Sequence, residues 1–348
     1  MNKVSLIPCR HPTTVCWVDD NEEYLHNAAM NLAHDVPYRL YSSPFKLLKQ
    51  LEPQMRNQPP WERFVELDRE NFDCDLNESL LRGRFSKFVM EIDRPIRFER
   101  VSVLIVDYAM DGMDGVELSR RLQQGPFKII LLTGKADEKT AVAAFNEGII
   151  DCFLFKNRSD LEQTLKREVS RLQQEFFYDL TAMARGSLYQ NPYGFLCDPY
   201  FIDFFLELCG GKNCVEYYLR RNPLGFYLID AAGKMRFLAI HTEQDVPDYI
   251  DATRDLGAPE ELIHRMESRR WMPFFPSETN ILYDRGREDW ERYLHPVEAL
   301  SGNVTYYYSV LDAEDLNLRD PITSNVFPFN NYLDRIDAER FGSDPIVG

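Results

Sequence analysis

The stretch VSVLIVDYAMDGMDG, residues 101–115, decides the fold of the first half of this chain. Residues 101–106 are almost continuously apolar, which is typical of a strand buried on both faces of a parallel sheet. Asp107 ends that run, and a glycine-containing turn follows it. Similar short apolar runs occupy residues 14–18, 129–132 and 152–155, each followed by helical periodicity or a turn. We therefore expect an α/β domain built on a parallel sheet.

Polar side chains stand where each of these runs ends. Asp19 and Asp20 follow the first run, Asp107 the second, Thr133 the third and Lys156 the fourth. In open α/β sheets, ligands bind at the carboxyl ends of the strands, so these groups should share one crevice. Three carboxylates repel one another unless a divalent cation lies among them, and Mg²⁺ prefers oxygen ligands. An ammonium and a hydroxyl opposite them suit a phosphoryl group on an aspartate.

Four pieces of this pattern resemble the receiver domain of two-component response regulators. They are Val18–Asn21, Ile105–Asp107 with Met110–Gly115, Leu132–Gly134, and Phe155–Lys156. The resemblance implies a CheY-like, doubly wound five-stranded parallel sheet of order 2-1-3-4-5. It implies a phosphorelay in which a sensor histidine kinase or a phosphotransfer protein is the partner. A weak self-dephosphorylation would be the only enzymatic activity that it brings.

The resemblance also implies roles for individual residues. Asp107 would accept the phosphoryl group, and Asp19, Asp20, Asp107 and the Ala109 carbonyl would hold Mg²⁺. Thr133 and Lys156 would contact the phosphoryl oxygens, Phe153 would move with Thr133 as a switch, and Ala109 and Lys135 would tune the phosphoryl lifetime. Two positions depart from the family: Asn157 stands where proline usually follows the lysine, and Asp111 replaces a frequent proline. Neither departure removes a functional group.

The chain between Asp20 and Asp107 is longer than this fold needs. Two helices and two strands take roughly 40 to 50 residues. We predict a helix over 22–34, a strand over 38–41, and a helix that begins at Ser43-Pro44 and runs through Leu51. The surplus is an insertion at about 52–100. It either packs on its own sheet edge or forms a dimerisation or partner surface.

A chain of 348 residues is expected to form two domains, a receiver over 1–175 and an output domain over 176–348. The last receiver helix should span about 159–175 and either break near Glu175 or continue through residues 176–178. The 7 cysteines are scattered and odd in number, which suits reduced thiols. With no signal peptide and no long apolar run, we expect a cytoplasmic protein with no membrane partner.

The second half predicts an α+β output domain. Residues 225–230 and 234–240 form a hairpin pattern, and residues 304–310 a further strand. Helices are expected over 199–208, 246–256, 260–269 and 289–294. The aromatic tail after Asp320 should wrap over this domain rather than float free.

The output half contains no recognisable catalytic motif. His241 and Glu243 have the spacing of a zinc deaminase half-site, but no paired cysteines follow, so a strand-end histidine is the simpler interpretation. Cys197, Cys209 and Cys214 are interpreted as free thiols, and the Gly210-Gly211 pair as a helix terminus.

Charge bears on what the output domain binds. Residues 176–348 hold 16 Lys and Arg against 28 Asp and Glu, and no basic stripe. DNA-binding modules need a basic face, because phosphate contacts supply much of their affinity. DNA is therefore disfavoured as a partner, though not excluded.

Three functions remain open for a response regulator of this kind. The output domain binds a protein or a small ligand, or is an unrecognised enzyme, or is a transcription regulator with an unusual DNA-binding surface. The layout also resembles the response regulators of the Legionella-type quorum-sensing (Lqs) circuit. The mechanism we expect is dimerisation gated by phosphorylation of Asp107. The sequence identifies neither the kinase nor the output ligand.

Overall fold

The fold comes from a computed structural model, which describes residues 5–29, 36–56, 92, 95–134, 137–181, 194–220, 224–274, 289–312 and 326–341. Those residues form two compact units. The parallel-sheet unit holds the described residues within 11–56, 95–181 and 331–341, and the antiparallel-sheet unit those within 5–10 and 194–330. The predicted insertion lies mostly at 57–91, outside the described residues.

The parallel-sheet unit has the predicted strand order. Its five strands run β3 (Tyr38–Tyr41), β2 (Thr14–Val18), β4 (Val101–Asp107), β5 (Lys128–Thr133) and β6 (Cys152–Phe155) across the sheet. All neighbouring pairs are parallel. In order of appearance this is 2-1-3-4-5, so the prediction of a doubly wound five-stranded sheet is confirmed.

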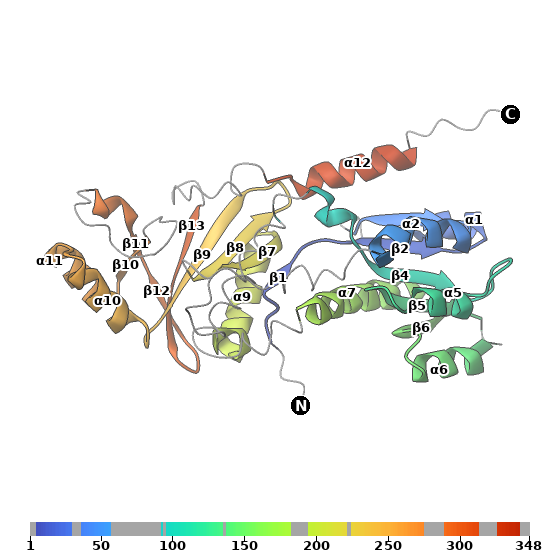
Figure 1. The fold of residues 1–348 in the computed structure, drawn as a ribbon, viewed down its shortest axis with the longest axis horizontal. Coiled ribbons are helices and arrows are strands. Elements are labelled where there is room, and N and C mark those ends of the chain that lie inside the picture. Colours follow the sequence, from blue (N-terminus) through green and yellow to red (C-terminus); the bar gives the residue numbers. More distant parts are fainter. Residues whose placement is uncertain are drawn as a thin grey trace. The chain divides into compact units, whose positions relative to one another are not determined.

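Helices cover both faces of this sheet (Figure 1). One face packs on α2 (Pro44–Arg56), α5 (Gly115–Leu122) and α6 (Glu138–Asn146), the other on α1 (Glu22–Ala29) and α7 (Leu161–Leu180). Alternate strand residues supply the two cores: Leu104 and Val106 face the first, Val103 and Ile105 the second. All four are fully buried, which is why the run reads as continuously apolar.

Several helix boundaries differ from their predictions. α2 begins at Pro44 as predicted but extends to Arg56. α7 does not break near Glu175, because Phe176, Phe177 and Leu180 are buried and keep the helix on the domain. α1 is described only to Ala29, so the rest of the helix predicted to residue 34 lies outside the described residues.

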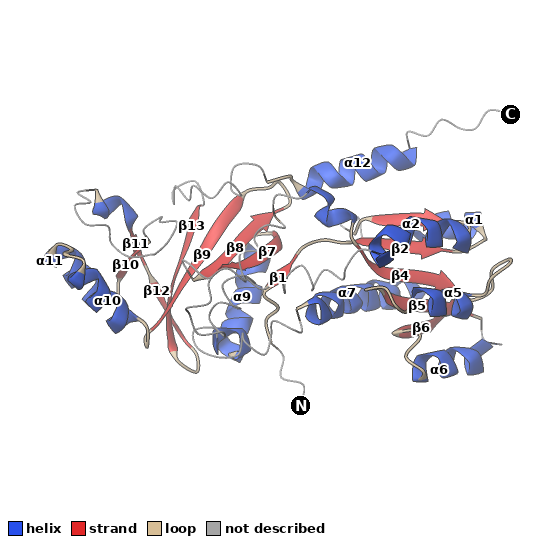
Figure 2. Cartoon of the chain, viewed as in Figure 1, coloured by secondary structure: helices blue, strands red, loops and turns tan. Residues whose placement is uncertain are grey.

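The antiparallel-sheet unit contains the α+β fold expected of the second half (Figure 2). Its six strands are β1 (Cys9–Arg10), β7 (Cys214–Arg220), β8 (Gly225–Asp230), β9 (Met235–Thr242), β13 (Thr305–Asp312) and β12 (Glu298–Ser301), in that order across the sheet. The predicted hairpin is β8–β9, and the predicted strand over 304–310 is β13. β7 was not predicted, although it pairs along most of its length with β8.

Helices and a small hairpin complete this unit. α9 (Pro199–Gly211) packs its aromatic side chains on the sheet, with Phe205 against Tyr217 and Phe226. α10 (Val246–Asp255) and α11 (Glu260–Glu267) adjoin the hairpin of β10 (Trp271–Pro273) and β11 (Leu294–Pro296). The helix predicted over 289–294 is wrong beyond one turn: a 3-10 turn at Trp290–Tyr293 leads into β11, because residues 294–296 pair with β10.

The two ends of the chain do not group as a simple division at residue 175 would place them. The domain boundary at residue 175 remains a prediction. Residues 9–10 pair with β7, so the N-terminal segment belongs with the antiparallel sheet. The last helix, α12 (Phe329–Phe341), groups from residue 331 onward with the parallel sheet. The tail was expected to wrap over the output domain; of its described residues, 326–341, Asn330 donates its amide to the Ala231 carbonyl of that half, while those from 331 onward belong to the parallel-sheet unit.

In the part of the chain that the structure describes, no helix is both long enough and apolar enough to cross a membrane.

Candidate functional site

Three aspartates meet at the carboxyl edge of the parallel sheet. β2 and β4 are neighbours in register, with Val18 opposite Val106, so the residues that follow them emerge together. Asp19 comes directly after β2, and Asp107 is the last residue of β4. One carboxylate oxygen from each of Asp19, Asp20 and Asp107 lies within 4.8 Å of the others. Asp19 and Asp107 are buried and Asp20 is exposed, so one side of the cluster opens to solvent.

Backbone contacts hold these carboxylates in place. The Asn21 amide donates to Asp19 Oδ1 at 3.0 Å, and the Asp111 amide donates to Asp20 Oδ2 at 2.9 Å. The turn after Asp107 is closed by the Gly115 amide, which donates to the Tyr108 carbonyl at 2.8 Å. A Cβ at Gly115 would lie 2.2 Å from the Asp107 carbonyl oxygen, so only glycine fits this close approach. The glycine thus keeps the loop over the site.

Lys156 joins the two buried carboxylates. Its Nζ lies 2.7 Å from Asp19 Oδ2 and 2.8 Å from Asp107 Oδ1. Its position follows from the sheet, because the Lys156 amide donates to the Thr133 carbonyl at 3.0 Å just beyond β5 and β6. The same ammonium lies 4.5 Å from the centroid of the Tyr24 ring. A cation between two buried carboxylates offsets part of their mutual repulsion.

The pKa values in this cluster show which effect dominates at each group. Burial raises the pKa of Asp107 above its ordinary value, and the Asp19 charge adds to the rise, although Lys156 opposes both. Burial acts to lower the pKa of Lys156, but its bonds to Asp107 and Asp19 outweigh this, so the pKa is raised. The lysine therefore stays charged, and Asp107 is held as a more basic carboxylate than usual.

The donor set fits Mg²⁺. Three carboxylates provide hard oxygen ligands, one of them facing solvent, from which water ligands would come. Mg²⁺ binds through a few carboxylates and retains several waters, and it often adjoins a phosphate. Asp19, Asp20 and Asp107 are the residues that would hold the ion.

The comparisons with known proteins agree with this geometry. Residues 90–166 match the family model described as the response regulator receiver domain. The chain contains a response regulator receiver domain. The family match begins towards the end of the predicted insertion, so it omits the Asp19-Asp20 pair, which the structure nevertheless brings beside Asp107.

Two curated relatives match the receiver domain over short segments. The chain is 48% identical over 61 residues to the cyclic di-GMP phosphodiesterase response regulator RpfG of Xanthomonas campestris pv. campestris, a segment that covers 16% of each chain. It is 42% identical over 59 residues to the transcriptional regulatory protein FixJ of Bradyrhizobium diazoefficiens, covering 16% of this chain and 28% of that one. These matches span well under a third of either relative's length.

One solved structure is similar over nearly the whole chain. The Legionella pneumophila response regulator LqsR is 28% identical, with a TM-score of 0.75, and the alignment covers 98% of this chain and 99% of that one. This confirms the resemblance to Lqs-type regulators that the layout suggested. It also extends the likeness to the output half.

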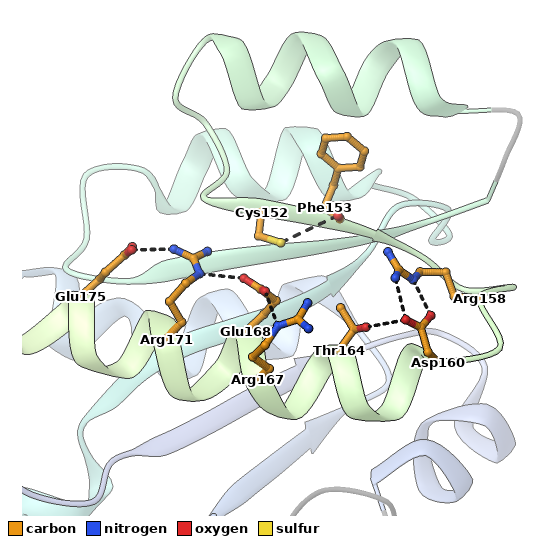
Figure 3. A network of polar contacts seen from close by, with 9 residues as sticks. All are labelled: Cys152, Phe153, Arg158, Asp160, Thr164, Arg167, Glu168, Arg171 and Glu175. Carbon is orange, nitrogen blue, oxygen red and sulfur yellow. Dashed lines mark hydrogen bonds and ion pairs between the residues drawn. The ribbon is translucent and has the colours of Figure 1, made fainter. Parts of the chain in front are cut away.

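The two residues predicted to act as a switch lie on β5 and β6. Thr133 ends β5 and is fully buried, and its hydroxyl donates to the Gly134 carbonyl at 3.1 Å. Phe153 lies on β6 opposite Leu131, half-buried, with its ring centroid 6.3 Å from Phe145 on α6. Figure 3 shows the Phe153 ring pointing towards that helix. The predicted switch roles of Thr133 and Phe153 remain predictions.

Of the other predicted residues of the receiver domain, the structure describes all but Lys135. Ala109 lies exposed in the bend directly after Asp107, a position consistent with its predicted roles in holding the metal and tuning. Lys135 falls outside the described residues. Asn157 is exposed in the turn after Lys156, and the backbone of Asp111 bonds Asp20.

Sequence reasoning missed Tyr24, whose ring lies beside the Lys156 ammonium. Burial raises the pKa of Tyr24, so its hydroxyl stays neutral at physiological pH. A signal was present: the Asn21 side chain caps the helix by accepting from the Tyr24 amide at 2.9 Å, which places Tyr24 in the first turn beside the aspartate pair.

Past Lys156, a network of polar contacts runs along α7 beside the strand that carries Cys152 and Phe153 (Figure 3). Arg171 pairs with Glu168 and Glu175 along the helix, and Arg158 pairs with Asp160 at its start. Arg158 lowers the pKa of Asp160 to about 2. These pairs are largely exposed and join residues close in sequence, so they stabilise α7 only modestly.

The candidates considered in the output half do not form a catalytic centre. His241 stacks on Tyr249 at 5.3 Å, and burial lowers its pKa to about 4, which suits a neutral packed histidine. Gly210 and Gly211 end α9, as predicted. Among the described residues, the aspartate cluster is the one group of three or more side chains arranged to hold a metal.

Proposed function

We propose that the protein is a phosphorylation-gated response regulator whose phosphoryl acceptor is Asp107. The observation that supports this most directly is the Lys156 ammonium, which lies within 2.8 Å of both Asp19 and Asp107 in a cluster of three carboxylates. A purely structural ion pair would need one carboxylate. Three carboxylates at the open edge of the sheet are explained if they bind a divalent cation that accompanies the phosphoryl group.

In the proposed reaction, an Asp107 carboxylate oxygen attacks the phosphorus of a phosphodonor. A bond from oxygen to phosphorus forms, and the bond from phosphorus to the donor breaks, leaving its electron pair on the donor. Lys156 offsets charge on the phosphoryl oxygens, and the Thr133 hydroxyl turns from Gly134 to donate to one of them. Mg²⁺ held by Asp19, Asp20 and Asp107, with the Ala109 carbonyl, would neutralise further charge on the phosphoryl group.

The donor in the cell would be a sensor histidine kinase or a phosphotransfer protein, as for receiver domains in general. Hydrolysis of the acyl phosphate ends the signal, and Ala109 and Lys135 would tune its lifetime. The phosphoryl group adds charge and acceptor oxygens that were absent before.

The conformational signal would pass from Thr133 to Phe153 and then to the surface of α6, β6 and α7. Phe145 on α6 is 48% exposed and adjoins Phe153, so a change in the Phe153 rotamer alters a surface that a partner can contact. We propose that this surface dimerises when Asp107 is phosphorylated. Its apolar centre and charged border suit an interface.

For the output domain we propose a ligand-binding role, with a protein or a small molecule as the ligand. A pocket of about 690 Å³ is lined by Glu261, His264, Arg265, Ser268, Arg270 and Trp271. The pocket is open to solvent, and its Arg265 pairs with Glu261 at 2.8 Å, so Arg270 and the Trp271 indole are the groups that would favour an anionic or aromatic ligand. The likeness to LqsR leads us to place the protein in the cytoplasm, in a circuit of the Legionella quorum-sensing type.

The test combines phosphoryl labelling with a measurement of assembly. Purified protein is treated with acetyl phosphate and Mg²⁺, and intact mass and light scattering after size exclusion are recorded. Wild type should gain one phosphoryl group and shift from monomer to dimer. Asp107→Asn should do neither, whereas Asp111→Asn, which removes an exposed carboxylate four residues away, should behave as wild type.

Labelling that persists in Asp107→Asn would place the acceptor elsewhere. Labelling of the wild type without any change in mass by light scattering would remove dimerisation from the proposal while leaving the acceptor intact.

A further inference from the structure

Two cysteines meet where α9 turns into β7 in the output domain. Cys209 lies in the last turn of α9, and Cys214 is the first residue of β7. Between them the Asn213 amide donates to the Gly210 carbonyl at 3.2 Å, and Asn213 takes a left-handed conformation with φ of 51°. This tight reversal turns the chain back on the end of the helix. Residues five apart in sequence are thereby brought face to face.

A helix end of this kind brings the side chains of residues 209 and 214 side by side, and the Cys209 and Cys214 thiols interact with each other. The Cys214 thiol also donates to the Glu216 carbonyl at 2.9 Å. Both cysteines are reduced in the structure. We propose that Cys209 and Cys214 form a reversible dithiol–disulfide pair that senses peroxide. Two thiols in contact need only small side-chain rotations to reach the disulfide bond length of about 2.05 Å.

The two thiols are not equivalent, which assigns their roles. The contact with Cys209 is the largest effect on Cys214 and lowers its pKa despite burial, whereas the same contact and burial raise the pKa of Cys209. Elsewhere burial simply raises the pKa of thiols, to about 11 at Cys152 and about 12 at Cys16. The thiolate is the reactive form, so Cys214 is the attacking residue and Cys209 the resolving one.

A metal site is the other use of neighbouring cysteines, and the surroundings disfavour it. Structural zinc takes four ligands, usually from cysteine and histidine. Cys9 lies on the adjacent strand β1, yet the three cysteines do not form a cluster of metal-ligand spacing within the described residues. Two thiols without further ligands suit redox chemistry.

The proposed reaction balances with hydrogen peroxide as the oxidant. The Cys214 thiolate attacks one peroxide oxygen and the O–O bond breaks; with one proton taken up, this gives a Cys214 sulfenic acid and water. The Cys209 sulfur then attacks the Cys214 sulfur, its proton leaves with the hydroxyl group as a second water, and the disulfide forms. Two thiols are oxidised and one peroxide is reduced to two waters.

The access of an oxidant to the two thiols and the effect of a disulfide on α9 both fit a sensor. Residues 210–213 are exposed, and nothing lies within 4 Å of where a Cβ would stand on Gly210 or Gly211, so a small oxidant can reach the half-buried thiols. The disulfide would tie the end of α9 to β7. That helix supplies Phe201 and Phe205 to the aromatic core, so its mobility affects the whole sheet. Redox state would thus be an input to the output domain that does not pass through Asp107.

The experiment uses the full-length protein and hydrogen peroxide. After treatment, the remaining thiols are blocked with iodoacetamide and the protein is digested with trypsin without reduction. Trypsin cleaves after Lys212 and so separates Cys209 from Cys214 unless a disulfide joins the two peptides. We expect the joined peptides in treated wild type and their separation on addition of a reductant.

Variants assign the partners. Cys197 shares the tryptic peptide of Cys209 and is also half-buried, so Cys197→Ser is the matched control and should retain the disulfide. Cys209→Ser should stop at a sulfenic acid on Cys214, trapped with dimedone, and Cys214→Ser should give neither product. The proposal would be overturned if the two peptides stayed separate in treated wild type, a result that does not depend on the folding of any variant. It would also be overturned if Cys197→Ser lost the joined peptides.

Discussion

The Asp107 carboxyl is subject to opposing effects, and their balance has a consequence for stability. Burial and Asp19 raise its pKa above 3.8, while Lys156 opposes them. Below 3.8 the carboxyl is protonated in the folded and the unfolded states, so it affects stability little. As pH rises through the folded pKa, the folded state must bear a buried charge, and stability falls. At neutral pH the native aspartate is therefore destabilising when no metal is bound.

Asp107→Asn should accordingly raise the free energy of unfolding at pH 7 in EDTA, since it removes this buried charge. At pH 3.5 the gain should largely disappear. Urea unfolding at the two pH values measures the difference. Asp111→Asn serves as control, because Asp111 is exposed and should change neither value. A gain that is equal at both pH values would contradict the charge argument.

Lys156 also competes with any cation for the carboxylate oxygens. Its ammonium occupies one oxygen of Asp19 and one of Asp107. Lys156→Ala should therefore tighten Mg²⁺ binding, by ~5-fold if about 1 kcal/mol of repulsion is removed. Isothermal titration calorimetry measures this directly. Lys166→Ala, which removes an ammonium paired with Glu162 on the exposed side of α7, should leave the affinity unchanged; tightening in both variants would indicate a general charge effect.

Among the secondary-structure elements, α12 shows what a tail can do for a domain. The Tyr332 side chain is fully buried, its hydroxyl lies 2.8 Å from Thr14 Oγ1, and its ring lies 5.4 Å from that of Phe98. Arg335 pairs with Glu99 at 2.5 Å. These contacts lie at the start of β2 and just before β4, the opposite end of those strands from Asp107. The helix therefore stabilises the sheet away from the site.

Tyr332→Ala should lower the free energy of unfolding of the receiver domain by about 3–5 kcal/mol, and Tyr332→Phe by only about 1 kcal/mol, because the ring contributes more than the hydroxyl bond. Chemical denaturation measures both. Asp334→Ala, at an exposed position of the same helix, controls for helix propensity and should stay near wild type. If Tyr332→Ala matched Asp334→Ala, α12 would not be part of the folding unit.

How far the sequence predicted these elements depends on whether their cause is local. The strands ending at Val18, Asp107 and Thr133 have apolar runs followed by polar residues, and their shared edge was predicted from that pattern, whereas their order was predicted from the resemblance to receiver domains. β1 is two residues long and exists only because β7 lies beside it, so no local pattern announces it. In the sequence, α12 is seen only as part of an aromatic tail. The contact between Tyr332 and Thr14 in the structure shows which domain the helix joins.

The same distinction applies to the side chains of the candidate sites. Tyr24 and the Cys209–Cys214 pair matter through what they contact after the chain folds back, and their spacing in the sequence matches no known motif. The φ of 51° at Asn213, which brings the two thiols together, is a conformation that asparagine tolerates but does not require. Such contacts become visible only when the fold is known.

At the scale of the whole molecule, the described chain changes compact unit five times: after residue 10, between 56 and 92, between 92 and 95, between 181 and 194, and after residue 330. A receiver domain cut out at the predicted boundary of 175 would retain β1 without its partner β7 and lose the buried Phe176, Phe177 and Leu180. It would also lose α12. The domain is contiguous in space but assembled from separate segments of sequence.

A fragment of residues 11–181 should therefore melt well below the receiver transition of the full chain, because the surface that binds Tyr332 and Ile336 is uncovered. Adding a synthetic peptide of residues 329–341 should raise its melting temperature in a concentration-dependent way, since a ligand that binds only the folded state stabilises it by mass action. Differential scanning fluorimetry measures the shift. The same peptide with Tyr332→Ala should have little effect, because it lacks the ring that packs on Phe98. A fragment that melts with the full chain and ignores both peptides would mean that residues 11–181 are sufficient, and that α12 rests on the domain without stabilising it.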